Sequence, residues 1–202
     1  SLRRLDTDYV DVLYLHMWDD TTPVDEVLAA AADLVRSGKV MYFAFSDTPA
    51  WVVSHALARA EQHAWPKPIA IQLPYSVLSR TIERAELPMA RAFNLAVLPW
   101  GVLSGGALTG KYRLPADGPR REAAASEAEL AAGDVIAEVA RSAGCTSAQV
   151  CLAWVRQQPG LIVPILGART EAQLEDNLGA LSLSLDPDQV ARINAVADFK
   201  PG

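Results

Sequence analysis

Polar or aromatic side chains follow the apolar runs of this 202-residue chain, at the point where each run ends. Imidazole, hydroxyl and amide groups donate and accept hydrogen bonds, and an arginine presents a planar fork of donors to anions. Such groups could hold a small polar molecule and polarise a carbonyl. The five runs are DVLYL, VMYFAF, IAIQL, LAVLPW and LIVPIL. His16 follows the first run, and Ser46 and Asp47 follow the second. Gln72 lies near the end of the third run, Trp100 ends the fourth before Gly101, and the fifth leads to Gly167, Ala168 and Arg169.

These runs alternate with stretches of helical periodicity, which predicts an α/β fold. We expect strands at 9–15, 40–45, 69–73, 95–100 and 161–166 and helices at 24–37, 49–63, 88–93, 128–142, 147–158, 171–178 and 187–197. Strands in βα alternation form a parallel sheet covered on both faces. A doubly wound sheet and part of a (β/α)₈ barrel both fit, and in either one the functional groups lie beyond the carboxyl ends of the strands. The five sites above therefore share one rim and predict a small-molecule site.

Helix caps support these boundaries. Thr22 is expected to cap the helix at 24–37, and Thr146 with Gln149 forms a capping-box pattern before the helix at 147–158. Thr170 and Asp186 are the expected acceptors at the starts of the last two helices.

Composition excludes several classes of function. The net charge is −6 with no basic cluster, so nucleic acid and anionic membrane surfaces are not expected partners. No apolar run approaches the roughly 18 residues that a membrane span needs, and no signal peptide is evident. Cys145 and Cys151 match neither a redox pair nor a zinc framework; reduced core thiols in a cytoplasmic protein, with no metal site, are expected.

One stretch of the chain resembles a nucleotide-binding motif. GGALTGK at 105–111 fits seven positions of a phosphate-binding P-loop, but Tyr112 stands where Ser or Thr should bind magnesium. Two prolines follow instead of a helical pattern, so the nucleotide-hydrolase interpretation is not favoured.

Five stretches together resemble the aldo-keto reductase family: DVLYLHMWD, LVRSGKVMYFAFSDT, IAIQLPYS, VLPWGVLSGGALTGKY and VPILGARTEAQLEDNLGAL. They cover nearly the whole chain in the family's order. The resemblance implies a (β/α)₈ TIM barrel that binds NADPH in an extended pose without a glycine-fingerprint domain. Residues 1–202 would be a single domain truncated at its N-terminal side, and the five strands would be the fourth to eighth of the barrel.

The resemblance also assigns roles on the substrate and nicotinamide side. His16 matches the active-site histidine that donates a hydrogen bond to the substrate carbonyl, and Trp18 would line the substrate pocket. Ser46, Asp47 and Gln72 match the contacts to the nicotinamide carboxamide. The family more often has Asn at position 47, and an ionised Asp offers no donor. Helix capping before Pro49 is the competing interpretation of Ser46 and Asp47.

Further residues match the rest of the cofactor site. Trp100 would stack on the nicotinamide ring, and Arg169 would bind the 2′-phosphate, which favours NADPH over NADH. A capping box formed by Thr170 and Gln173 competes with the adenosine role of this segment. The remaining expected contacts are Gly101, Val102, Leu103, Ser104, Gly105, Lys111 and Arg121 for the pyrophosphate, and Gly167, Gln173, Asp176 and Asn177 for the adenosine. His55 and His63 are expected to be surface or packing residues.

The implied activity is hydride transfer between NADPH and an aldehyde or ketone. The family's mechanism also uses an Asp, a Tyr and a Lys from its first three βα units, and none of the five tyrosines here matches that Tyr. The isolated chain is therefore expected to bind NADPH weakly and to be inactive. A truncated enzyme and a non-catalytic NADPH-binding regulatory or auxiliary subunit are the two alternatives. The carbonyl substrate and the oligomeric state are not predicted.

Overall fold

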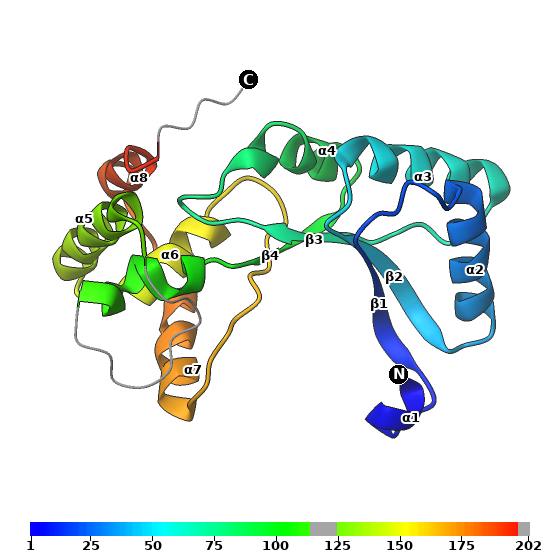
Figure 1. Cartoon of the computed structure of the whole chain (residues 1–202), viewed down its shortest axis with the longest axis horizontal. Helices are drawn as coiled ribbons and strands as arrows, with labels where there is room; N and C mark the ends of the chain where they lie inside the picture. The colour runs from blue at the N-terminus through cyan, green and yellow to red at the C-terminus, as the bar shows by residue number, and fades with distance from the viewer. Residues whose placement is uncertain (114–124, 198–202) are drawn as a thin grey trace. The chain divides into compact units, whose positions relative to one another are not determined.

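The computed structural model describes residues 1–113 and 125–197, which form two compact units (Figure 1). Unit 1 contains Ser1–Leu73 and Ala85–Leu98; unit 2 contains Pro74–Arg84 and the described residues from Pro99 onward.

One parallel sheet organises the first half of the chain. Its strands are β1 (Val10–His16), β2 (Val40–Ser46), β3 (Ala70–Pro74) and β4 (Ala96–Trp100), and they lie side by side in that order. The intervening helices are α2 (Val24–Arg36), α3 (Ala50–His63) and α4 (Glu86–Ala92), after a short α1 (Leu2–Leu5). A helix between successive strands returns the chain to the same end of the sheet, which makes the pairing parallel. The first four predicted strands are thus confirmed.

The expectation that every strand is covered on both faces is wrong for β1. None of its residues is buried, whereas Phe43, Ala44 and Phe45 of β2 are fully enclosed. β1 lies at the edge of the sheet and has a neighbour on one side only among the described residues. An edge strand lacks the flanking helices and strand that would cover it, so its apolar residues stay half exposed.

Unit 2 is mainly helical. Its helices are α5 (Glu127–Ala143), α6 (Ser147–Arg156), α7 (Glu171–Leu178) and α8 (Pro187–Asn194). Short 3₁₀ turns are η1 (Thr81–Glu83), η2 (Ser104–Thr109), η3 (Lys111–Arg113) and η4 (Gly179–Leu181). Six consecutive buried residues, Val150–Val155, place α6 at the centre of this unit.

The fifth predicted strand, 161–166, is absent as a strand. Only Ile162 forms an isolated bridge, and the Ile165 amide donates to the Pro99 carbonyl at 2.8 Å. Leu161, Val163 and Ile165 are exposed. The apolar pattern is that of a buried strand. A strand, however, needs hydrogen bonds to a neighbouring strand along its length, and the described residues provide only this short contact with β4.

A buried polar cluster fastens the segment after β3 to α6 and α8. The Arg80 guanidinium donates to both carboxylate oxygens of Glu83, at 2.7 and 3.0 Å, and to Asn194 at 3.1 Å. Tyr75 donates its hydroxyl to Glu83 at 2.7 Å, and Trp154 donates its indole N–H to Asn194 at 3.1 Å. The Tyr75 hydroxyl, the Arg80 guanidinium, the Glu83 carboxylate and the Trp154 indole N–H thereby each have a hydrogen-bond partner, as buried polar groups require.

The predicted caps are mostly present. Thr146 with Gln149 and Asp186 with Gln189 form capping boxes, and Thr170 caps α7. The Thr22 prediction is wrong: Pro23 is the N-cap residue of α2, and the Thr22 hydroxyl instead donates to Asp19 at 2.6 Å. Among the described helices, none is long and apolar enough to cross a membrane.

Candidate functional site

His16, Ser46 and Gln72 lie in one row across the carboxyl ends of three neighbouring strands. The strand register pairs His16 with Ser46 and Ser46 with Gln72. His16 is exposed, and its Nε2 lies 3.3 Å from Oδ2 of Asp47. Asp47 has a left-handed backbone (φ 47°), and its amide donates to the Gln72 carbonyl at 3.0 Å. The structure therefore brings together the four polar residues that sequence placed at this rim.

Ser46 has a buried hydroxyl without a hydrogen-bond partner among the described residues. The residue is 2% exposed. Leaving a buried polar group unpaired costs about 1–3 kcal/mol, so a ligand group that reaches this oxygen would be stabilised. The capping interpretation is wrong here, because Pro49 is the N-cap residue of α3 and no side chain caps that helix.

Trp18 follows directly beyond β1. Its indole is half-buried and meets the Phe45 ring edge-on, with 6.4 Å between ring centroids. Met17, with φ 62°, turns the chain between His16 and this indole.

A cavity of about 710 Å³ in unit 2 gathers most of the remaining predicted cofactor residues. Those that line it are Trp100, Gly101, Val102, Leu103, Gly105, Lys111, Gly167, Arg169, Gln173, Asp176 and Asn177. Ser104 is the exception: its hydroxyl lies 3.1 Å from that of Ser76 and is absent from the cavity wall. Trp100 is 41% exposed, which leaves its ring available for stacking.

The part of the cavity wall that follows β4 is a tight turn in which several residues have a left-handed backbone conformation. Gly101, Gly105 and Gly106 have φ of 70°, 63° and 94°, which glycine adopts at little cost. A side chain at Gly106 would also collide with the Lys111 ammonium and its stem. The Lys111 ammonium donates to the Gly105 carbonyl at 2.7 Å. This turn therefore places the Lys111 side chain and residues 101–103, 105 and 106 in the wall of the cavity.

The P-loop interpretation is not supported by this geometry. Lys111 begins the 3₁₀ turn η3, which ends at Arg113, the last described residue before the gap. A P-loop lysine instead opens an α-helix.

Another part of the cavity wall lies at the start of α7. The Thr170 hydroxyl accepts from the Gln173 amide at 3.2 Å, and Oε1 of Gln173 accepts from the Arg169 amide at 2.8 Å. Gln173 thus fixes the backbone that carries Arg169 instead of completing a capping box with Thr170. Asn177, 6% exposed, lies at the last turn of α7 in the same wall.

The far end of α7 is tied to α6 by a cluster that sequence reasoning missed. Gln149 donates to the Asp176 carbonyl at 2.7 Å and to Oδ1 of its carboxylate at 3.1 Å. The Thr146 hydroxyl donates to Oδ2 of Asp176 at 3.0 Å. A capping box accounts for both residues of α6 locally, so the pattern gave no signal of a second role. The cavity residues that were not predicted are Gly106, Thr109, Thr146, Ser147, Ala148, Leu152, Ile165 and Leu166.

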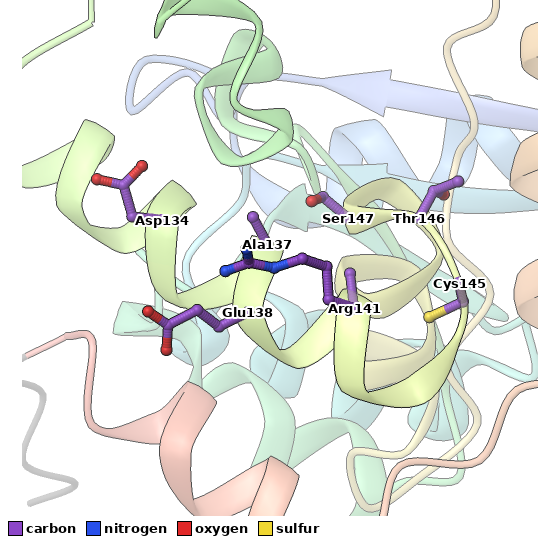
Figure 2. Close-up of a pocket in the computed structure, with 8 residues that line it drawn as sticks. Asp134, Ala137, Glu138, Arg141, Cys145, Thr146 and Ser147 are labelled. Atoms are coloured by element: carbon purple, nitrogen blue, oxygen red, sulfur yellow. The ribbon is translucent and has the colours of Figure 1, made fainter.

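A second, more open hollow of about 590 Å³ lies along α5 and the turn into α6 (Figure 2). Asp134, Glu138 and Arg141 contribute from α5, and Cys145 and Thr146 from the turn. No residue predicted for the site lines it. Both cysteines are free thiols; the prediction of a core position is confirmed for Cys151, which is buried, and is wrong for Cys145, which is half-buried and lines this hollow. Burial raises the pKa of Cys145, with the Asp176 charge as a smaller cause, and raises that of Cys151 to about 12.

The remaining predicted positions are distributed as follows. Arg121 lies outside the described residues. His55 and His63 are exposed on α3, as predicted for surface residues, and His63 stacks on Trp65. The described part of the chain contains no cluster of three acidic, His or Cys side chains that could hold a metal ion.

Parallel βα units whose strand ends carry polar groups define an α/β protein with polar side chains gathered at that rim. The model of the aldo/keto reductase family matches residues 1–198. A probable aryl-alcohol dehydrogenase of Saccharomyces cerevisiae is 36% identical over the whole chain, which covers 64% of that protein. Norsolorinic acid reductase of Emericella nidulans is 34% identical over the whole chain, which covers 52% of it.

The chain therefore belongs to the aldo/keto reductase family. It spans between half and two thirds of the length of these two relatives. Membership implies a (β/α)₈ barrel, and the four parallel strands with their helices are consistent with part of one.

Proposed function

We propose that this protein is an NADPH-dependent oxidoreductase that transfers a hydride between NADPH and an aldehyde or ketone. The observation that carries the proposal is the cavity of about 710 Å³, because residues from segments far apart in sequence meet there with the chemistry a dinucleotide needs. In this assignment β1 to β4 are the fourth to seventh strands of the barrel, and 161–166 occupies the place of the eighth.

The side chains of unit 2 fit a phosphorylated dinucleotide. Arg169 offers two parallel donors to a 2′-phosphate, an arrangement that NADH cannot use. Lys111 and the amides after Trp100 supply positive charge and donors for a pyrophosphate. The exposed face of Trp100 supports a flat aromatic ring by stacking.

The strand ends of unit 1 fit the reacting end. The unpaired Ser46 hydroxyl and the Gln72 amide can donate to and accept from a carboxamide. NADPH, when bound, supplies the hydride. His16 then donates a hydrogen bond to the substrate oxygen, which polarises the carbonyl and holds its carbon in position. Asp47, 3.3 Å from the imidazole, orients the ring for this task.

The substrate class follows from the neighbours of His16 and from the relatives. Trp18 gives a flat apolar wall next to the strand end, which suits an aromatic substrate. A relative named as a probable aryl-alcohol dehydrogenase points in the same direction. We therefore propose aryl aldehydes and ketones as the first substrates to test.

These 202 residues by themselves are expected to bind NADPH weakly and not to turn over. No tyrosine here matches the family's proton donor: Tyr14 precedes His16 within β1, and Tyr75 is buried with its hydroxyl on Glu83. A non-catalytic NADPH-binding subunit is the second candidate, and the same observation favours it.

The test expresses the complete open reading frame that contains these residues, beside the 202-residue chain. Each protein is mixed with NADPH and benzaldehyde, and NADPH oxidation is followed by absorbance. We expect turnover by the complete product, lowered strongly by His16→Ala, and none by the 202-residue chain. NADPH binding without turnover by the complete product would favour the regulatory subunit. Absence of both would overturn the proposal.

A further inference from the structure

Neither Gln149 nor Thr146 was predicted to bind the cofactor, yet both bind the side chain of Asp176, which was. Gln149 does not line the cavity of about 710 Å³, whereas Thr146 lies in its wall. Both oxygens of the Asp176 carboxylate accept hydrogen bonds from α6: Oδ1 from Gln149 and Oδ2 from Thr146. The Asp176 carbonyl accepts a third, from Gln149 at 2.7 Å. This carboxylate is therefore largely committed to its own protein.

We propose that Thr146, Gln149 and Asp176 form a clamp that positions α7, so that Asp176 acts as a positioning residue and Arg169 and Asn177 make the cofactor contacts. The inference rests on the proposed function, since it concerns how the adenosine end of that site is built.

Gly179 gives independent support for the clamp. Its φ of −56° is ordinary for a helix, so its backbone does not require glycine. A side chain there would instead collide with the Gln149 amide. The small residue at the end of α7 thus leaves the space through which the Gln149 side chain reaches Asp176.

The clamp also joins two helix ends. Thr146 and Gln149 form the capping box that starts α6, with the Gln149 amide donating to Thr146 Oγ1 at 3.3 Å. The same two side chains then bind the last turn of α7. Because Arg169 is fixed at the first turn through Gln173, both ends of α7 are anchored, and only a small displacement of its cavity face is allowed.

Two substitutions distinguish the role of Gln149 in binding Asp176 from its role in capping α6. Gln149→Met keeps the length of the side chain and removes every hydrogen bond that the side chain makes. Gln149→Glu keeps the acceptor for the Thr146 amide and favours a helix N-terminus, but it replaces the donor to Asp176 with a repelling carboxylate.

The matched control is Gln157→Met. Gln157, at the other end of α6, makes two hydrogen bonds to the Leu185 backbone, at 3.0 and 2.8 Å, and does not line the cavity. Its loss removes similar bonds from the same helix, so it reports general destabilisation.

The experiment measures binding of adenosine 2′,5′-bisphosphate and of nicotinamide mononucleotide to each variant by calorimetry. We expect both Gln149 variants to weaken the bisphosphate by about tenfold, equivalent to about 1.4 kcal/mol, while the affinity for the mononucleotide stays within about twofold. Gln157→Met should leave both ligands within the same range. Equal losses in the Gln149 and Gln157 variants, or none in either, would overturn the inference.

Hydrogen exchange in the ligand-free protein keeps the inference distinct from the proposed function. Amides of α7 should exchange faster in Gln149→Met than in Gln157→Met. If the parent chain binds no bisphosphate, the cofactor assignment fails, and the exchange data still decide whether the clamp exists. Unchanged exchange in α7 would refute the clamp.

Discussion

Removing Glu83 tests the buried cluster that fixes the segment after β3. In the Glu83→Ala variant, Arg80 loses both carboxylate bonds and the Tyr75 hydroxyl loses its acceptor. The Arg80 and Glu83 side chains are only 11% and 15% exposed, so water cannot replace the lost partner well. Breaking a buried ion pair of this kind costs about 3–5 kcal/mol.

An exposed ion pair in the same unit provides the comparison. Arg192 and Glu138 lie 2.8 Å apart with side chains 47% and 54% exposed. Such pairs contribute about 0.2–1 kcal/mol, so Glu138→Ala should change little. At roughly 2–4 °C per kcal/mol, Glu83→Ala should lower Tm by about 6–20 °C and Glu138→Ala by no more than about 4 °C.

Urea denaturation followed by tryptophan fluorescence gives the free energies of unfolding, since Trp154 lies within the cluster. A difference of less than about 1 kcal/mol between the two variants would refute the reasoning, because burial would then not distinguish the pairs.

Three further predictions concern single positions. Gly133→Ala would bring a methyl group 2.9 Å from the Ala107 carbonyl oxygen. Although alanine favours a helix over glycine by about 1 kcal/mol, we expect the free energy of unfolding to fall by up to about 2 kcal/mol in urea denaturation. A stabilised variant would contradict this. Gly106→Ala should displace the Lys111 ammonium and weaken NADPH binding by about tenfold in a fluorescence titration, and unchanged affinity would exclude a cofactor role for this turn. Burial is the main cause, and the hydrogen bond to Glu83 the next, of a Tyr75 pKa raised above its ordinary 10.0. The free energy of unfolding that this tyrosine contributes is therefore intact below pH 10.0 and falls as the pH rises further. The Tyr75→Phe variant should lose less stability at alkaline pH than the parent, and an equally steep loss would contradict this.

Local patterns predicted much of the fold. Four strands and most helix caps lie where the sequence placed them, because alternation of apolar runs with capped helical stretches is encoded within neighbouring residues. The rim residues His16, Ser46 and Gln72 followed from the same logic, since parallel strands end on one side.

What the sequence did not predict depends on distant neighbours. The exposure of β1 and the failure of 161–166 to form a strand depend on which segments lie beside them. The second role of Gln149 depends on a contact with α7, 27 residues away, and its capping role already explained its presence locally. Gly106 is likewise required by the position of Lys111 and not by its neighbours alone.

The most direct test of NADPH recognition is a calorimetric comparison of NADPH and NADH binding to the product of the complete open reading frame (the parent) and to its Arg169→Met variant. We expect the parent to bind NADPH at least about tenfold more tightly than NADH and Arg169→Met to remove this preference, because a charged hydrogen-bonding partner of the 2′-phosphate is lost. Equal affinity for the two cofactors in the parent, or a preference that survives in Arg169→Met, would contradict it.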